Sequence, residues 1–254
     1  GYYARARNLH ACARAVAATG GFPRTRDELR KLPGIGDYTS AAIAAIAFGE
    51  PVAAVDTNVE RVVARLHAIQ QPVAEARGDI RNYAQAMLSA DRPGDFAQAM
   101  MDLGSTICRP KAPRCEICPL AAVCAAFASG RPEDYPAPKL RKARPHRHDI
   151  AWWIERAGAI WLVRRPDKGL LGGMAALPGG EWAEHGPPAK PAASISHGFT
   201  HFTLDLHVVE RSSPPDGDGW WQPLDKIDRV GLPTLYRQAV RAMLAHRSDQ
   251  RRAA

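Results

Sequence analysis

The distribution of the five cysteines constrains this chain more than any other feature of its sequence. Cys12 stands alone, whereas four cysteines follow the spacing C-x6-C-x2-C-x5-C, at Cys108, Cys115, Cys118 and Cys124. Disulfides in small secreted domains are spread along the chain, so thiols this crowded indicate a shared metal or iron–sulfur centre in a reducing compartment. Zinc is compatible with four cysteines, but the spacing lacks the two C-x2-C pairs of zinc ribbons and favours a [4Fe–4S] cluster.

Length and composition limit the class of protein. The chain has 254 residues, of which 46% are hydrophobic and 24% charged, and this is enough for two globular domains. No apolar run is long enough to span a membrane. The net charge of +8 is compatible with a polyanionic partner. The first residues, Gly1 to Asn8, hold neither an initiating Met nor a signal peptide, and we expect them to lie within a helix of a longer protein.

The hydrophobic pattern differs between the two halves of the chain. Up to Ala128 it predicts consecutive helices, and no strand is expected before residue 148. The expected helices are Tyr3–Ala18, a short one from Thr25 to about Leu32, Asp37–Phe48, one through Val59–Ile69, and Asp95–Ile107. The first domain, residues 1–128, is therefore predicted to be mainly α-helical.

A connector and a second domain follow. Residues 129–148 hold four prolines and several basic residues, and we expect an extended, solvated linker there. The pattern then changes to strands around a hairpin turn, followed by a closing helix. The expected elements are Ile150–Glu155, Ile160–Arg164, an alternating strand from Phe202 to Val208, and the helix Leu235–His246. The second domain, residues 149–248, is therefore predicted to be α+β.

Two glycines mark the turn between the second and third predicted helices, in Leu32-Pro33-Gly34-Ile35-Gly36. Glycines in such a turn can expose backbone N–H groups at the start of the next helix, where the helix dipole also favours an anion. A phosphate could therefore approach the main chain, which is how proteins hold a nucleic-acid backbone without reading its sequence. An ordinary helix–helix turn explains the same five residues equally well.

A second candidate site lies at the start of the helix through Val59. Thr57 and Glu60 have capping-box spacing, which predicts Thr57 as the N-cap residue and Asp56 just before it. The carboxylate of Asp56 would then face the positive end of the helix and remain ionised. It either complements the helix dipole or is held ready to stabilise positive charge that develops on a substrate.

Three of these features occur together in one superfamily. The glycine hairpin, an Asp at a helix start about twenty residues later and the cysteine loop resemble the helix-hairpin-helix DNA glycosylases of the endonuclease III superfamily. The segments GYYARARNLH (1–10) and QAMMDLG (98–104), with the second domain, make the chain similar to the MutY-type adenine DNA glycosylases. This resemblance covers nearly the whole chain, and it implies a chain truncated at its N-terminus.

The resemblance implies a catalytic site around Asp56, whose carboxylate would stabilise the cationic sugar as the base leaves. The family's Asp-Gly-Asn stands here as Asp56-Thr57-Asn58, which keeps the carboxylate and the amide. Lyase-competent members carry a Lys where this chain has Tyr38, so no Schiff base is expected and the enzyme would be a monofunctional glycosylase. Tyr38 and Asn58 would position Asp56 and the sugar. The Glu that protonates adenine in the family is expected before Gly1.

The resemblance also implies the contacts to DNA. The hairpin around Gly34 and Gly36 would bind the backbone of the duplex, and Tyr2 would act as a wedge beside the lesion. Arg109 lies between the first two cysteines, as do two further basic residues, and would place positive charge within reach of a phosphate.

The second domain resembles the Nudix-like domain of the same family, because residues 170–180 match its glycine-rich turn. Phe199-Thr200-His201 aligns with the family's loop that probes 8-oxoguanine, usually Phe-Ser-His, and Thr200 keeps the hydroxyl. Residues 181–188 contain two prolines and cannot form the acidic helix of a Nudix hydrolase, so nucleotide hydrolysis is not expected.

These expectations combine into one function. The enzyme would excise adenine opposite 8-oxoguanine or guanine from double-stranded DNA, as a monomer that carries a [4Fe–4S] cluster, in the bacterial cytoplasm and on the nucleoid while it acts. Two alternatives remain at this point. One is an endonuclease III-like pyrimidine glycosylase and lyase, and the other is a noncatalytic DNA-binding fragment.

Overall fold

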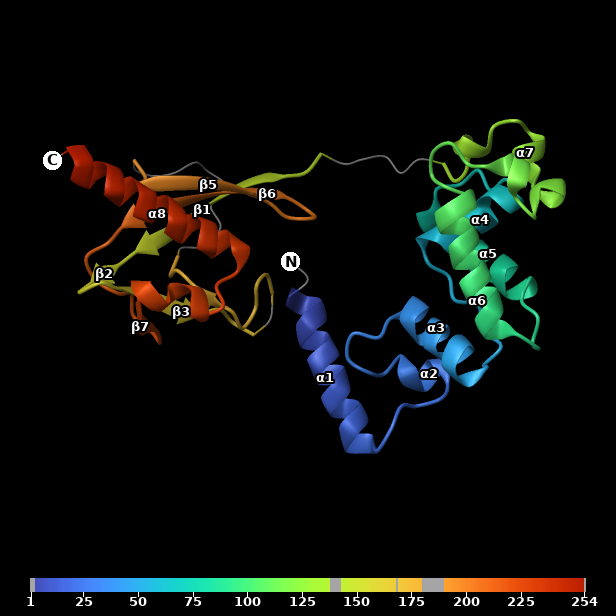
Figure 1. Ribbon diagram of the computed structural model, residues 1–254, viewed down its shortest axis with the longest axis horizontal. Helices are drawn as coiled ribbons and strands as arrows, with labels where there is room; N and C mark the ends of the chain where they lie inside the picture. The colour runs from blue at the N-terminus through green and yellow to red at the C-terminus, as the bar shows by residue number, and fades with distance from the viewer. Residues whose placement is uncertain (1–2, 138–142, 168, 180–189, 254) are drawn as a thin grey trace. The chain divides into compact units, whose positions relative to one another are not determined.

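The computed structural model describes residues 3–137, 143–167, 169–179 and 190–253 (Figure 1). The chain divides into two compact units, Ala4–Arg141 and a unit formed mainly by Lys142–Ala254. We call these the helical domain and the sheet domain. The predicted fold class is confirmed, since the first is mainly α-helical and the second is α+β. In the described part of the chain, no helix has the length and apolarity needed to cross a membrane.

In its described residues, the helical domain contains the helices α1 to α6 and then short helical segments around the cysteines (Figure 1). Its helices are α1 (Tyr3–Thr19), α2 (Arg26–Leu29), α3 (Asp37–Phe48), α4 (Thr57–Leu66), α5 (Val73–Ala86) and α6 (Pro93–Asp102). The turns that follow are η1 (Leu103–Ile107), η2 (Cys115–Ile117), η3 (Ala121–Val123), α7 (Ala125–Ala128) and η4 (Pro132–Asp134).

Two apolar clusters hold these helices together. One centres on α3, where buried alanines such as Ala41, Ala44 and Ala45 allow neighbouring helices to approach closely. Gly94 in the first turn of α6 shows how close this approach is, because a Cβ there would lie 3.0 Å from the carbonyl oxygen of Ala45. The other cluster packs the apolar face of α4 against α5 and α6. The second cluster therefore fixes α4, the helix that carries the candidate site.

Two helices differ from the prediction. The expected single helix Asp95–Ile107 changes at Asp102 into a π-helical turn, η1. The hydroxyl of Thr106 donates to the carbonyl of Asp102 (2.6 Å), and the N–H of Cys108 donates to the carbonyl of Leu103 (2.7 Å), five residues back. Helix α5 was assigned to no predicted element, because it buries little besides Ala76, Ile80 and Ala84.

Within the residues that the structure describes, the sheet domain contains two sheets and one long helix. Its elements are β1 (His146–Trp153), β2 (Glu155–Arg156), β3 (Ala159–Arg164), β4 (Ala175–Ala176), β5 (Ala193–Gly198), β6 (Thr203–Glu210), β7 (Trp220–Pro223), the 3-10 helix η5 (Leu224–Arg229) and α8 (Thr234–Ala253). In the first sheet, β6 lies between β1, to which it is parallel, and β5, to which it is antiparallel. In the second, β3 pairs with β2, β4 and β7.

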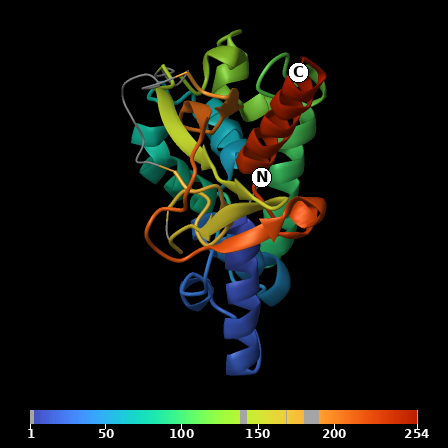
Figure 2. The same ribbon diagram turned by 90° about the vertical axis from the view of Figure 1, so that its left-hand side faces the viewer.

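One face of the first sheet is apolar and packs toward α8. Leu204, Leu206 and Val208 alternate along β6, as predicted, and are fully buried with residues of α8 in one apolar cluster. Helix α8 lies against β5 and β6, as Figures 1 and 2 show. The predicted hairpin turn is confirmed between β2 and β3, where Ala157 and Gly158 both adopt positive φ. Strand β1 begins at His146, earlier than expected.

Candidate active site and cysteine centre

Asp56 is the N-cap residue of α4, so the predicted cap at Thr57 is wrong. One carboxylate oxygen accepts hydrogen bonds from the N–H groups of Asn58 (2.9 Å) and Val59 (2.8 Å). The other oxygen accepts from the side-chain amide of Asn58 (3.0 Å). A carboxylate satisfies two helix N–H groups better than a hydroxyl does, and Thr57 is consequently the first residue of the helix. The half-buried carboxylate is thus held in one orientation.

Tyr38 reaches the surroundings of Asp56 from a different helix, α3. Its hydroxyl donates to the sulfur of Met101 in α6 (2.8 Å). Burial raises the pKa of Tyr38 above its ordinary value, and the negative charge of Asp56 raises it further. The structure therefore brings Tyr38 within electrostatic range of Asp56 and keeps the phenol protonated.

Arg61 joins the neighbourhood of Asp56 to the cysteine loop. Its guanidinium donates to the side-chain oxygen of Asn58 (3.0 Å), to the carbonyl of Gly104 (2.6 Å) and to that of Cys108 (2.7 Å). Gly104 must lack a side chain, because a Cβ there would lie 2.6 Å from the Cβ of Asn58. The sequence prediction missed Arg61, although a basic residue three positions after Asn58 on one helix face was a usable signal.

The four clustered cysteines converge on one cavity. Cys108, Cys115, Cys118 and Cys124 line it together with Arg65 and several apolar side chains. Burial raises the pKa of Cys115, and the other three cysteines raise it further, as expected for thiols that face one another. None of the five cysteines is in a disulfide, and Cys12 is buried separately in α1. The donor set is that of a thiolate-bound metal or iron–sulfur centre.

Arg65 also lines the cavity of the cysteine centre, and the sequence prediction missed it. Arg65 is 2% exposed and lies on α4 among apolar neighbours. The hydrophobic pattern of that segment therefore gave no reason to select it. One terminal nitrogen lies 3.3 Å from the sulfur of Cys108. The guanidinium also donates to three main-chain carbonyls, those of Arg109 (2.7 Å), Pro110 (3.1 Å) and Tyr135 (3.0 Å). A buried positive charge therefore faces the thiols that a metal centre would hold as anions.

The glycine turn requires its first glycine more than its second. Gly34 has φ +75°, and a Cβ there would lie 2.6 Å from the Cβ of Asn8 in α1. Gly36 is the N-cap of α3, without a side-chain cap, and nothing lies within 4 Å of the position its Cβ would take. The start of α3 is thus open at the surface. The carboxylate of Asp37, the next residue, is paired with Arg30 (2.8 Å) and Arg81 (3.0 Å).

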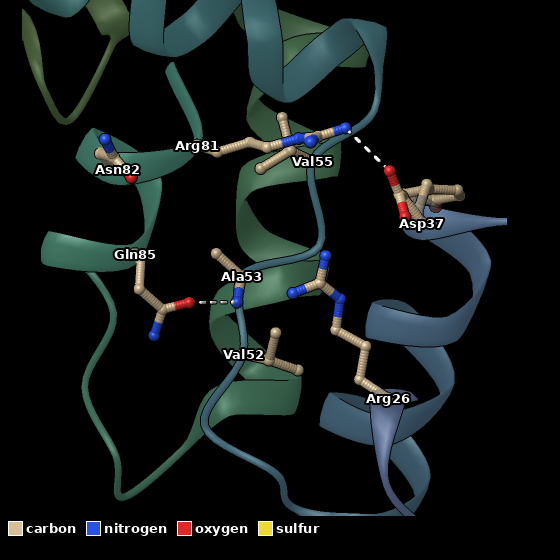
Figure 3. Close-up of a pocket in the computed structure, with 9 residues that line it drawn as sticks. Arg26, Asp37, Val52, Ala53, Val55, Arg81, Asn82 and Gln85 are labelled. Atoms are coloured by element: carbon tan, nitrogen blue, oxygen red, sulfur yellow. Dashed lines mark hydrogen bonds and ion pairs between the residues drawn. The ribbon is translucent and has the colours of Figure 1, made fainter. Parts of the chain in front are cut away.

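A cavity of about 260 Å³ lies between α3, residues 51–55 and α5 (Figure 3). Gln85 holds its wall in place, because the side-chain oxygen accepts from the N–H of Ala53 (2.9 Å). The lining residues combine two guanidinium groups with polar and apolar side chains. They are Arg26, Asp37, Tyr38, Val52, Ala53, Val55, Arg81, Asn82 and Gln85. Tyr38 therefore borders both this polar cavity and the surroundings of Asp56.

The remaining predicted DNA contacts are exposed or outside the described residues. Arg109 is exposed, and its guanidinium donates to the carbonyl of Ala112 within its own loop (2.9 Å). Lys111 and Arg114 are exposed in the same loop. Tyr2 lies outside the described residues, as do residues 181–188.

Phe199, Thr200 and His201 form the tip of the β5–β6 hairpin in the sheet domain. The N–H of Phe199 donates to the carbonyl of Phe202 (2.9 Å), and the two rings stack with centroids 4.8 Å apart. His197 contacts the Phe199 ring edge-on at the same centroid distance. Thr200 and His201 are exposed. The tip thus presents a braced aromatic ring next to two exposed polar side chains.

Known proteins share both domains. Residues 1–87 match the HhH-GPD superfamily of base excision DNA repair proteins, and residues 150–242 match the NUDIX domain. The chain is 42% identical over 198 residues to adenine DNA glycosylase of Arabidopsis thaliana, covering 70% of this chain and 31% of the relative. It is 30% identical over 329 residues to that of Mus musculus, covering 99% and 63%. The chain thus spans less than two thirds of either relative.

Among solved structures, that of a thermostable thymine-DNA glycosylase is 32% identical, with a TM-score of 0.44, and the match covers 49% of this chain and 58% of that one. The family models place an HhH-GPD domain of base excision DNA repair proteins in residues 1–87 and a NUDIX domain in residues 150–242, and the chain is similar to adenine DNA glycosylases.

Proposed function

We propose that the protein is a monofunctional DNA glycosylase that hydrolyses the N-glycosidic bond of adenine mispaired with 8-oxoguanine or guanine. The observation that carries this proposal is the carboxylate of Asp56, held by three hydrogen bonds at the start of α4 with Tyr38 nearby. A curated relative that matches both halves of the chain is an adenine DNA glycosylase. The target base must leave the stack for this carboxylate to reach its sugar.

Loss of the base leaves positive charge on the sugar, as in other glycoside hydrolyses. Asp56 stabilises or captures this cation, because its carboxylate is fixed before the reaction and needs no reorganisation. The side-chain amide of Asn58 donates to one oxygen of this carboxylate. The phenol of Tyr38 lies near it and stays neutral, because its pKa is raised. Tyr38 offers no amine, so the imine that precedes strand cleavage in lyases does not form.

DNA is held by its backbone. The open start of α3 after Gly36 offers main-chain N–H groups to a phosphate, and the positive φ of Gly34 shapes the turn. Arg109 and Tyr2 are proposed as further contacts, the first to a phosphate and the second as a wedge at the lesion. The net charge of +8 favours the encounter with a polyanion.

The four convergent cysteines are proposed to hold a [4Fe–4S] cluster. They fit such a group because the thiols face one cavity and Arg65 supplies a buried positive charge beside Cys108. When bound, the cluster cross-links the loop that carries Arg109. Zinc in the same site would give no visible absorption and no acid-labile sulfide, which separates the two centres.

The tip of the β5–β6 hairpin is proposed to recognise 8-oxoguanine through Phe199, Thr200 and His201. A braced ring can stack on a base, and the neighbouring hydroxyl and imidazole can hydrogen-bond to it. Replacing Phe199 and His201 together by Ala should reduce the preference for 8-oxoguanine over guanine in the strand opposite adenine. An unchanged preference would reject this role. We also propose that the protein acts as a monomer, on the nucleoid in the bacterial cytoplasm.

Single-turnover excision by the full-length gene product tests the activity. Duplexes with 8-oxoguanine:adenine should lose adenine, and the strand should break only after alkali treatment. Asp56→Asn should bind the same duplex but release no adenine, whereas Asp79→Asn, an exposed change on α5, should leave excision unchanged. Excision that survives Asp56→Asn would overturn the proposal. Release of oxidised pyrimidines with borohydride trapping would favour a lyase, and binding without any excision would favour a noncatalytic protein.

A further inference from the structure

One face of the β1-β6-β5 sheet carries three histidines and an aspartate where β1 pairs with β6. The face that packs toward α8 is apolar, as described above. Alternation along the strands places His146 and His148 of β1 on the opposite face. Asp205 and His207 of β6 share that face, because His148 is the register partner of Asp205. The sheet thus brings together side chains that are almost sixty residues apart in the sequence.

The donor atoms of this group are close enough to share one ion. The Nε2 of His146 lies 2.9 Å from Oδ2 of Asp205. One nitrogen from each of His146 and His148 and one oxygen of Asp205 all lie within 4.8 Å of one another. The Nδ1 of His148 lies 3.2 Å from Nε2 of His207, so a fourth donor is adjacent.

Hydroxyl groups already hold the outer atoms of these side chains. The Nδ1 of His146 lies 2.8 Å from the hydroxyl of Thr203, and the Nδ1 of His207 lies 2.9 Å from that of Ser194. Ser196 donates to the Oδ1 of Asp205, the oxygen that faces away from His146. Metal-binding histidines and carboxylates in proteins generally have such outer partners, which orient the free atom toward the ion.

We propose that His146, His148 and Asp205 form a binding site for one divalent cation of the zinc class, with His207 as the fourth donor. Imidazole nitrogens and a carboxylate are the ligands that zinc prefers when thiolates are absent, at about 2.0–2.2 Å. Atoms bound to one ion at that distance lie roughly 3–4 Å apart, so small movements close the site. The site is distinct from the cysteine centre, which belongs to the helical domain.

The position of the site indicates what the ion does. His146 and His148 are in the first half of β1, and His146 is exposed. An ion bound to both and to Asp205 ties the start of β1 to β6, in the parallel pairing that has no hairpin to support it. The ion thus anchors the strand that follows the connector.

Zinc titration of the full chain, with its cysteine centre filled, tests the proposal. Calorimetry should show one tight zinc ion per chain, with at least a tenfold lower affinity in His148→Gln and in Asp205→Asn. His197→Gln is the matched control, because His197 lies on the other face of β5 and contacts Gln238 (3.1 Å). A crystal of the zinc-bound protein should give an anomalous peak between His146, His148 and Asp205.

Tryptophan fluorescence separates a lost site from a misfolded domain, since all six tryptophans lie in the second half of the chain. Variants with wild-type fluorescence and weakened zinc binding support the site. Equal zinc affinity in the wild type, His148→Gln and Asp205→Asn would overturn it, as would an anomalous peak elsewhere. His207→Gln should also bind zinc more weakly if His207 is the fourth donor. Unchanged zinc affinity in this variant would show that only three protein side chains bind the ion.

Discussion

The guanidinium of Arg65 lies 3.3 Å from the sulfur of Cys108, in a residue that is only 2% exposed. A buried positive charge is tolerated only where neighbouring groups compensate it. Three carbonyls and the sulfur of Cys108 contact it here, because α4 carries Arg65 to the loop that begins at Cys108. Arg65 is therefore part of the cysteine centre, although it lies in a helix far from the cysteines in the sequence.

Replacing Arg65 by Met should destabilise the helical domain by about 1–3 kcal/mol, because three partly buried carbonyls lose their donor. The variant should also be purified with less metal or cluster than the wild type. Urea unfolding monitored by circular dichroism and iron and sulfide analysis check these two effects. Lys111→Met, an exposed change in the same loop, serves as the control, and equal stability of the two variants would contradict the role of Arg65.

Asp56 should show a stability effect that is separable from its catalytic effect. Asp56→Ala removes the acceptor of two helix N–H groups and should cost about 1–2 kcal/mol of unfolding free energy. Asp56→Asn keeps a capping oxygen and should cost much less. Thermal unfolding of both variants, beside the excision assay, checks this difference. A large stability loss in Asp56→Asn would mean that its inactivity cannot be assigned to catalysis.

The two glycines of the turn should differ in their tolerance of alanine. Gly34→Ala should cost at least about 1 kcal/mol, because alanine at positive φ is strained and its Cβ would meet Asn8. Gly36→Ala meets no neighbouring atom and should leave stability nearly unchanged. Melting temperatures and the affinity for an undamaged duplex at several salt concentrations check the pair. Equal behaviour of the two variants would contradict the assigned turn geometry.

Asp149 should make the sheet domain less stable as the pH rises. Burial raises the pKa of Asp149 to about 6, from 3.8, so folding favours the protonated carboxyl. In the unfolded chain, Asp149 loses this proton near pH 4, whereas in the folded chain it keeps the proton until about pH 6. The free energy of unfolding therefore falls as the pH rises from about 4 to 6. Above pH 6 the ionised, buried carboxylate costs about 3 kcal/mol.

Asp149→Asn should therefore be more stable than the wild type by about 3 kcal/mol at pH 8 and by about half of that at pH 5. Asn keeps the oxygen that accepts from the N–H of Ile150 (2.8 Å). Tryptophan fluorescence in urea, with a chelator present, measures the sheet domain alone. Asp225→Asn, an exposed substitution, is the control. A difference between wild type and variant that does not change with pH would contradict the expected titration of Asp149.

Patterns within a single segment could be predicted from the sequence. The alternation of Leu204, Leu206 and Val208 predicted the buried face of β6, and capping chemistry predicted the short helix after Thr25, whose hydroxyl accepts from the N–H of Glu28. The start of α4 was predicted one residue late, because Thr57 and Asp56 can both cap a helix. Only the folded backbone shows which one receives the N–H groups.

Groupings of side chains from distant segments were decided by the tertiary structure. The cysteine spacing by itself predicted a thiol-rich centre, and the structure brings these four residues to one cavity. Arg61 and Arg65 join that centre only because α4 packs against η1 and α7. His146, His148 and Asp205 meet only because β1 and β6 pair in parallel at one register. Local periodicity sets which side of an element a residue occupies, whereas packing between elements determines what that side faces.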